Sequence, residues 1–148
     1  VWLFRGHVLR SLGKDGKALE AYLKGLAVAP ENAALHNMAG VQLAALGQLA
    51  DAAESFQTAR RHDPQLLHTD INLGLLAQAG GDWTGAAELM RKAGAANPGF
   101  YHDEWVGRAE RDPFRAFYYE TVLGYAGLGY HIGYCEQRAS GTVPPSGR

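Results

Sequence analysis

The 148-residue sequence has a single cysteine, no excess of either charge and no long apolar run. Cys135 has no second cysteine to pair with, which excludes an internal disulfide and fits a reducing, cytoplasmic compartment. The formal net charge is −1 with scattered Lys and Arg, so no basic surface for nucleic acid or an anionic membrane is indicated. No apolar run approaches the roughly 20 residues of a membrane-spanning helix, and no secretory hydrophobic region precedes the first helical pattern. We therefore expect a cytoplasmic protein that binds neither nucleic acid nor membrane.

What the sequence does contain is a pattern that recurs every 34 residues. Five sets of positions share this spacing without slippage, and a fixed period of this size is typical of stacked-repeat proteins. The sets are Gly6, Gly40 and Gly74; Gly13, Gly47 and Gly81; Ala18, Ala52 and Ala86; Tyr22, Phe56 and Met90; and Pro30, Pro64 and Pro98.

Each period predicts two helices joined by a turn. In the first period Trp2, Leu9 and Leu12 recur at helical spacing, and Gly13 then suits the left-handed conformation that ends a helix. Pro30 ends the second helix because proline has no N–H to donate. We expect antiparallel helix pairs near residues 1–28, 33–61 and 67–95.

These residues resemble the tetratricopeptide repeat, a helix–turn–helix unit of 34 residues. The resemblance covers units 1–32, 33–66 and 67–100 and implies an all-α, right-handed superhelix. It also implies that Gly40 and Ala52 allow the two helices of a unit to approach, so that a bulky side chain at either position would hold them apart. Arg5 departs from the family pattern, which has Leu there, and we expect its stem to cover apolar surface while its charge stays in water. Trp83 is expected just before the second helix of its unit.

After Pro98 the period fails. Residues 101–138 are predicted to form capping helices, including 101–111 and one that begins at Asp112-Pro113, or a degenerate fourth repeat, and 139–148 a disordered tail. In a fourth repeat Leu123-Gly124 would correspond to Leu73-Gly74, and Cys135–Ala139 would be a broken second helix. The stretch 124–134 has too many glycines for a stable isolated helix. Because Val1 already lies in a helical pattern, we expect a longer parent protein.

The resemblance implies that a peptide or a partner's helix binds in a concave groove lined by the first helix of each unit. Asn37 and Asn72 could bond to a peptide backbone, and Met38, Val41, Ile71 and Leu75 could contact its side chains. The alternative is that the repeats hold a neighbouring domain or helix, which buries the groove within the protein. The groove positions are Leu3, His7 and Arg10; Asn37, Met38, Val41 and Ala44; and His68, Ile71, Asn72, Leu75 and Gln78.

One groove type is excluded by its residues. Receptors of chaperone C-terminal carboxylates in this family use a set of Lys, Asn and Arg side chains. Here those places hold Leu3, His7, Met38, His68 and Asn72, which cannot supply the cationic grip. We therefore expect a protein or peptide partner of another kind.

The histidines suggest a metal site that we reject. His102, Glu104, His131, Arg138 and Ser140 follow an order that resembles the iron and 2-oxoglutarate oxygenases. That chemistry needs a barrel of about eight strands, and too few residues remain to build one. We interpret these side chains as exposed residues near a helix end, with no metal. His36 and His68 lie in different units and are interpreted as packing or groove residues.

Residues 120–133 resemble the first glycine motif of S-adenosylmethionine-dependent methyltransferases, and the GLGYH turn of related flagellin-glycosyltransferase domains. A strand at Thr121–Leu123 followed by Gly127 and Gly129 could cradle a nucleotide-type cofactor. Leu123 and Tyr125 depart from that pattern, and no sheet follows, so we expect no cofactor and no catalysis in this chain. The main hypothesis is a protein-interaction scaffold. The alternative is the accessory region of a larger methyltransferase- or glycosyltransferase-like enzyme.

Overall fold

The computed structural model describes residues 1–96 and 128–141. These residues form seven α-helices and no strand, which confirms the all-α prediction for this part of the chain. No helix among them is long and apolar enough to cross a membrane. The helices are α1 (Trp2–Ser11), α2 (Asp15–Val28), α3 (Ala33–Ala45), α4 (Leu49–His62), α5 (Leu67–Ala79), α6 (Trp83–Ala96) and α9 (Leu128–Ala139).

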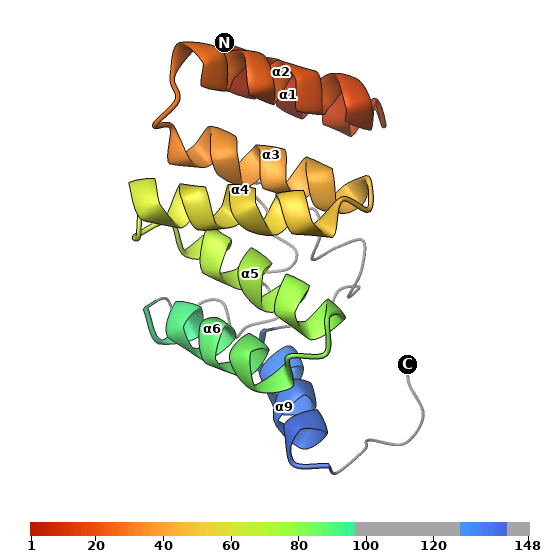
Figure 1. The fold of residues 1–148 in the computed structure, drawn as a ribbon, viewed down its shortest axis with the longest axis vertical. Helices are drawn as coiled ribbons and strands as arrows, with labels where there is room; N and C mark the ends of the chain where they lie inside the picture. Colours follow the sequence, from red (N-terminus) through yellow and green to blue (C-terminus); the bar gives the residue numbers. More distant parts are fainter. Residues whose placement is uncertain (97–127, 142–148) are drawn as a thin grey trace.

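The helices repeat with the period of the sequence. Helices α2, α4 and α6 each begin and end 34 residues after the one before, and so do α3 and α5. Each first helix packs on the second helix of its pair, and each second helix packs on the first helix of the next pair. Figure 1 shows the pairs stacked along the longest axis, from α1 and α2 at one end to α6 and α9 at the other. The predicted bounds of the three pairs agree with the structure to within one residue.

The turn inside each pair is built by a glycine with a positive φ angle. The φ angles of Gly13, Gly47 and Gly81 are 68°, 79° and 83°. In the second pair Gly47 N–H donates to Ala44 C=O at 3.0 Å, and Gln48 N–H donates to Leu43 C=O at 2.9 Å. The same two bonds recur in the other pairs, and together they form the Schellman motif that ends a helix. A side chain at these positions would be strained, which explains the glycine.

A second glycine in each pair lies against a large side chain of the partner helix. A Cβ atom on Gly40 would lie 2.6 Å from Cε1 of Phe56, and one on Gly74 would lie 3.0 Å from Cγ of Met90. Gly6 faces Tyr22 in the same way. Ala52 is fully buried in this contact region. Two of the recurring sets of positions, Gly6, Gly40 and Gly74 and Tyr22, Phe56 and Met90, are therefore the two sides of one helix–helix contact, as predicted.

The apolar side chains between the helices form two main clusters that follow the stack. The first lies around α2 and α3 and comprises Ala18, Tyr22, Leu35, Met38 and Ala39. The second runs from α3 to α9 and comprises Val41, Ala44, Ala52, Phe56, Ile71, Leu73, Leu75, Met90, Ala93 and Ile132.

Helix α9 differs from the broken second helix predicted for Cys135–Ala139. Leu128–Ala139 is one continuous helix that includes Gly129 and Gly133, so Cys135–Ala139 is not a separate broken helix. It packs on α6, and such tertiary contact outweighs the weak helix propensity of glycine. The chain turns after Ala139 at Gly141, whose φ of 77° matches the glycines that end α1, α3 and α5. The structure also differs at Trp83, which is the first residue of α6 rather than its predecessor.

Several predictions lie outside the described residues. They are the helices at 101–111 and from Asp112-Pro113, the strand at Thr121–Leu123, the correspondence of Leu123-Gly124 to Leu73-Gly74, and residues 142–148 of the tail.

Candidate protein-binding groove

The predicted groove positions lie on α1, α3 and α5, the first helices of the three pairs. Most of those on α3 and α5 are buried, including every apolar residue named for peptide contact. The positions on α1 are only half-buried, as are His68 and Gln78 at the two ends of α5. The buried positions are Asn37, Met38, Val41, Ala44, Ile71, Asn72 and Leu75, and the half-buried ones on α1 are Leu3, His7 and Arg10.

The two asparagines of the groove bond to each other. Asn72 Nδ2 donates to Asn37 Oδ1 at 3.0 Å, and Thr69 Oγ1 donates to the same oxygen at 3.2 Å. All three side chains are buried. From the sequence we predicted that these amides could bond to a peptide backbone, and we did not predict the hydrogen bond from Thr69. One turn of helix separates Thr69 from Asn72 on α5, so their spacing was the available signal.

Asn72 keeps one polar atom without a partner. Its Oδ1 is buried, and no donor in the described part of the chain reaches it. A buried carbonyl oxygen of this kind is costly to leave unpaired. A peptide N–H or a water reaching Asn72 Oδ1 would satisfy it without breaking the bond to Asn37.

The α1 end of the groove is connected to the core through His7. Nδ1 of His7 lies 3.2 Å from the hydroxyl of Tyr22, and the two rings meet edge to face with centroids 5.9 Å apart. Burial raises the pKa of Tyr22 to about 12, although the nearby charge of Arg10 acts in the opposite direction. Tyr22 therefore stays protonated at neutral pH and holds His7 in place. Arg10 follows on the same helix and is half-buried beside them.

Helix α9 packs on α6 and touches the end of α5. The Cys135 thiol donates to Gln78 Oε1 at 3.3 Å, and Ile132 belongs to the apolar cluster that contains Val41 and Ile71. Burial raises the pKa of Cys135 to about 11, and the adjacent Glu136 carboxylate adds to the effect. The thiol is therefore protonated and acts as a donor rather than a nucleophile. The sequence did not indicate this contact, because Gln78 and Cys135 are 57 positions apart.

Three contacts hold α9 against α6. The Tyr134 ring meets the Trp83 ring edge to face with centroids 5.8 Å apart, and the Arg138 guanidinium lies 4.7 Å from the centroid of Trp83. Arg91 and Glu136 form an ion pair. Aromatic and cation–π contacts of this kind each stabilise by about 0.5–1.5 kcal/mol.

Two further polar side chains cross between repeats, and neither was predicted. Asp70 of α5 is buried, and its carboxylate lies 3.5 Å from Arg60 Nη1 of α4 and 3.1 Å from Lys92 Nζ of α6. Gln42 of α3 is also buried and donates to Asp15 Oδ1 of α2 at 2.7 Å. The Asp70–Arg60 and Gln42–Asp15 contacts join one pair to its neighbour, so they set the register of the stack.

The histidines of the rejected metal site do not all fall in the described part. His102 and Glu104 lie outside it. His131 is buried on α9, so its interpretation as an exposed residue is wrong. Within residues 1–96 and 128–141 no group of three His, Cys, Asp or Glu side chains could hold a metal ion. His36 stacks on His62 with ring centroids 5.6 Å apart, and its Nε2 lies 2.7 Å from the Pro30 carbonyl oxygen. His36 is therefore a packing residue at the junction of two pairs.

The glycine motif is only partly described. Gly127 lies outside the described residues. Gly129 is the second residue of α9.

A scan of the chain against known protein families finds no match, and a search of curated proteins finds no similar sequence.

Proposed function

We propose that this chain is a protein-interaction module of the tetratricopeptide type, and that it holds polypeptide along the face formed by α1, α3 and α5. One observation carries the proposal: the 34-residue period extends to the helix bounds, the turn hydrogen bonds and the glycine contact inside each pair. A right-handed superhelix with a concave face is what such a period produces in repeat proteins.

Helix α9 shows how the stack receives a further helix. It packs on α6 as α3 packs on α2 and α5 packs on α4, and its Cys135 thiol reaches Gln78 at the end of α5. The last pair therefore holds a helix of the chain itself on its α6 side, which leaves the face formed by α1, α3 and α5 for a second polypeptide.

The α1 end supplies the positions that a second polypeptide reaches. Leu3, His7 and Arg10 are half-buried on consecutive turns of α1, and they present one apolar side chain, one imidazole and one guanidinium. Arg10 is the cation of this set, so a carboxylate or backbone carbonyl of the partner would be its acceptor. The apolar residues of α3 form the floor beneath, and they act through packing rather than direct contact.

Peptide selection tests the proposal. The full chain is immobilised and used to enrich binders from a displayed library of 16-residue peptides. The enriched peptides are then titrated against the wild type, the His7→Ala/Arg10→Ala variant and the control Glu54→Ala/Gln57→Ala. Glu54 and Gln57 are exposed on α4, a second helix. Loss of affinity of about tenfold or more, or 1.4 kcal/mol, is expected for the groove variant alone. Enrichment of peptides that bind all three proteins equally would contradict the proposal.

A further inference from the structure

The first helices of the second and third pairs have almost no solvent-exposed side. No residue of α3 from Ala33 to Ala44 is exposed, and the same holds for α5 from Leu67 to Gln78. Helices α2, α4 and α6 differ, because each buries one side and exposes the other. A helix that is buried on every side has neighbours on every side.

Two sides of each buried helix face described helices. On α3, Leu35 and Met38 belong to the apolar cluster that contains Tyr22 of α2, and Gly40 lies against Phe56 of α4. Helix α5 packs on α4 and α6. These contacts leave a third side of α3 and of α5, which we call the inner stripe.

The inner stripe follows positions three and four residues apart on each helix. Its members are Asn37, Val41, Ala44, Ile71, Leu75 and Gln78. Val41, Ile71 and Leu75 are 0%, 0% and 1% exposed, although the helices that pack on α3 and α5 lie on their other sides. Helix α9 reaches the stripe at Gln78, at the end of α5. The burial of Val41 and Ile71 therefore indicates a further packing partner within the chain.

Two stretches of the chain lie outside the described residues, namely 97–127 and 142–148. The shorter one has no aromatic residue, whereas the longer one has eight of the 15 aromatic residues of the chain. The longer stretch joins α6 to α9, and its 31 residues could span about 100 Å when extended, several times the length of α3. Residues 97–127 therefore have the reach and the apolar side chains that the inner stripe needs.

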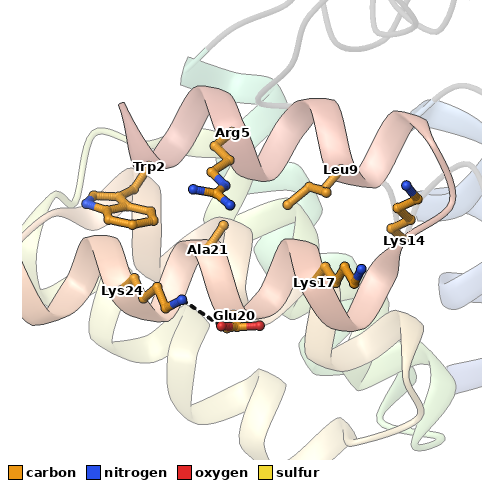
Figure 2. Close-up of a pocket in the computed structure, with 8 residues that line it drawn as sticks. All are labelled: Trp2, Arg5, Leu9, Lys14, Lys17, Glu20, Ala21 and Lys24. Carbon is orange, nitrogen blue, oxygen red and sulfur yellow. Dashed lines mark ion pairs between the residues drawn. The ribbon is translucent and has the colours of Figure 1, made fainter.

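The hollow between α1 and α2 suits such a segment less well. Figure 2 shows that charged side chains surround this hollow of about 300 Å³, and they are Arg5, Lys14, Lys17, Glu20 and Lys24. Aromatic side chains packed there would remove water from these charges, which is costly unless each charge is paired.

A buried oxygen beside the inner stripe favours polypeptide as its partner. Asn72 Oδ1 has no donor in the described part of the chain. Each residue of a polypeptide other than proline brings a backbone N–H group, so backbone that passes Asn72 can donate to this oxygen.

We propose that residues 97–127 pack on the inner stripe of α3 and α5 within the same molecule. The proposal rests on the proposed function, because it names a polypeptide that this part of the face holds. A second polypeptide reaches Leu3, His7 and Arg10 directly, but it reaches Val41 and Ile71 only by displacing the chain's own segment. A tethered competitor acts at an effective concentration on the order of millimolar, so partners with weak affinity stay at the α1 end.

Photo-crosslinking in the full chain tests the proposal. A diazirine amino acid of about the size of leucine replaces Val41 in one protein, Ile71 in a second and Gln57 in a third. Gln57 is the matched control, because it is exposed on α4 and lines a mainly apolar hollow of about 470 Å³ between α4 and the α5–α6 pair. We expect crosslinks to residues 97–127 at least about tenfold more often from positions 41 and 71 than from 57, because a covered side chain contacts protein rather than water.

Two further measurements make the result decisive. Circular dichroism shows that each variant keeps the helix content of the wild type, and two sites on the stripe ensure that one misfolded variant does not end the test. Mixing unlabelled and nitrogen-15-labelled copies separates crosslinks within one molecule from those between two. Crosslinks from the stripe to a second copy, to another part of the chain or to water alone would overturn the proposal.

The crosslinking needs no partner, so its outcome is separate from that of the peptide selection. Peptides that bind through His7 and Arg10, without crosslinks from positions 41 and 71 to residues 97–127, would support the proposed function and overturn the intramolecular packing. The reverse result would support the packing and contradict a second polypeptide at the α1 end.

Discussion

The amide of Asn72 donates a 3.0 Å hydrogen bond to Oδ1 of Asn37, and this bond joins the first helices of two consecutive repeats across 35 positions of sequence. Both side chains are buried, and Thr69 donates to the same oxygen. A stack of helices can slide along its apolar contacts, because those contacts have little direction. A buried pair of amides has one good geometry, so it fixes the relative position of α3 and α5.

Asn37→Ala should lower the free energy of unfolding by about 1–3 kcal/mol, because it leaves two buried donors, on Thr69 and Asn72, without an acceptor. Asn37→Leu combined with Asn72→Leu and Thr69→Val removes all three polar groups and should recover part of the loss. Urea unfolding of the two variants measures the difference. A single variant as stable as the wild type would mean that the amides contribute nothing to the interface.

Gly40→Ala should destabilise the protein by about 1–3 kcal/mol through overpacking, since its new Cβ would lie 2.6 Å from the Phe56 ring. Gly16→Ala is the matched control. Gly16 lies near the start of α2 with no atom within 4 Å of a Cβ added there, so this change should stabilise by up to about 1 kcal/mol. Thermal midpoints that move in the same direction for both variants would refute the contact assigned to Gly40.

The Arg60→Ala/Lys92→Ala variant should destabilise by about 3–5 kcal/mol, because it leaves the buried carboxylate of Asp70 without a cation. Adding Asp70→Leu to that variant should restore most of the loss, because no buried charge then remains. Asp70→Leu alone should cost little, since Arg60 and Lys92 are partly exposed and regain water. Equilibrium unfolding at fixed salt distinguishes these cases, and additive effects in the triple variant would contradict the pairing.

Alkaline pH should destabilise the fold through two buried groups whose pKa is raised. The folded state raises the pKa of Cys135 from 9.0 to about 11 and that of Tyr22 from 10.0 to about 12. Between the unfolded and the folded pKa the native state holds more protons, so stability falls as pH rises. The contribution of Cys135 is present below pH 9.0 and is lost toward pH 11. Cys135→Ala should therefore flatten the fall in urea midpoint from pH 8.5 to pH 10.5, and an unchanged slope would show that the thiol is not the source.

The resemblance of residues 120–133 to a methyltransferase glycine motif leads to a prediction of no binding. Calorimetric titration of this chain with S-adenosylmethionine should give no heat of binding, because Gly129 belongs to helix α9 rather than to a turn braced by a sheet. Affinity tighter than about 100 μM, or roughly 5.5 kcal/mol, that is lost in Gly127→Val would favour the enzyme alternative instead.

The sequence by itself determined the helix pairs, their turns and the contact inside each pair. These features are local or recur with the period. Gly47 adopts a φ angle that other residues avoid. Gly40 and Phe56 lie 16 positions apart, as do their equivalents in the other two repeats, so the repeating pattern contains both sides of the contact. Because the chain has three repeats, the turn glycine and the contact inside the pair each occur three times in the sequence.

Only the tertiary structure decided which side chains meet between pairs. Asn72 bonds to Asn37, and Cys135 reaches Gln78, because helices distant in sequence lie side by side. Helix α9 forms despite its glycines because α6 offers it Trp83 and Arg91 as partners. Helix propensity is a local property of a few tenths to one kcal/mol per residue, and the contacts that override it come from residues that the local sequence does not contain.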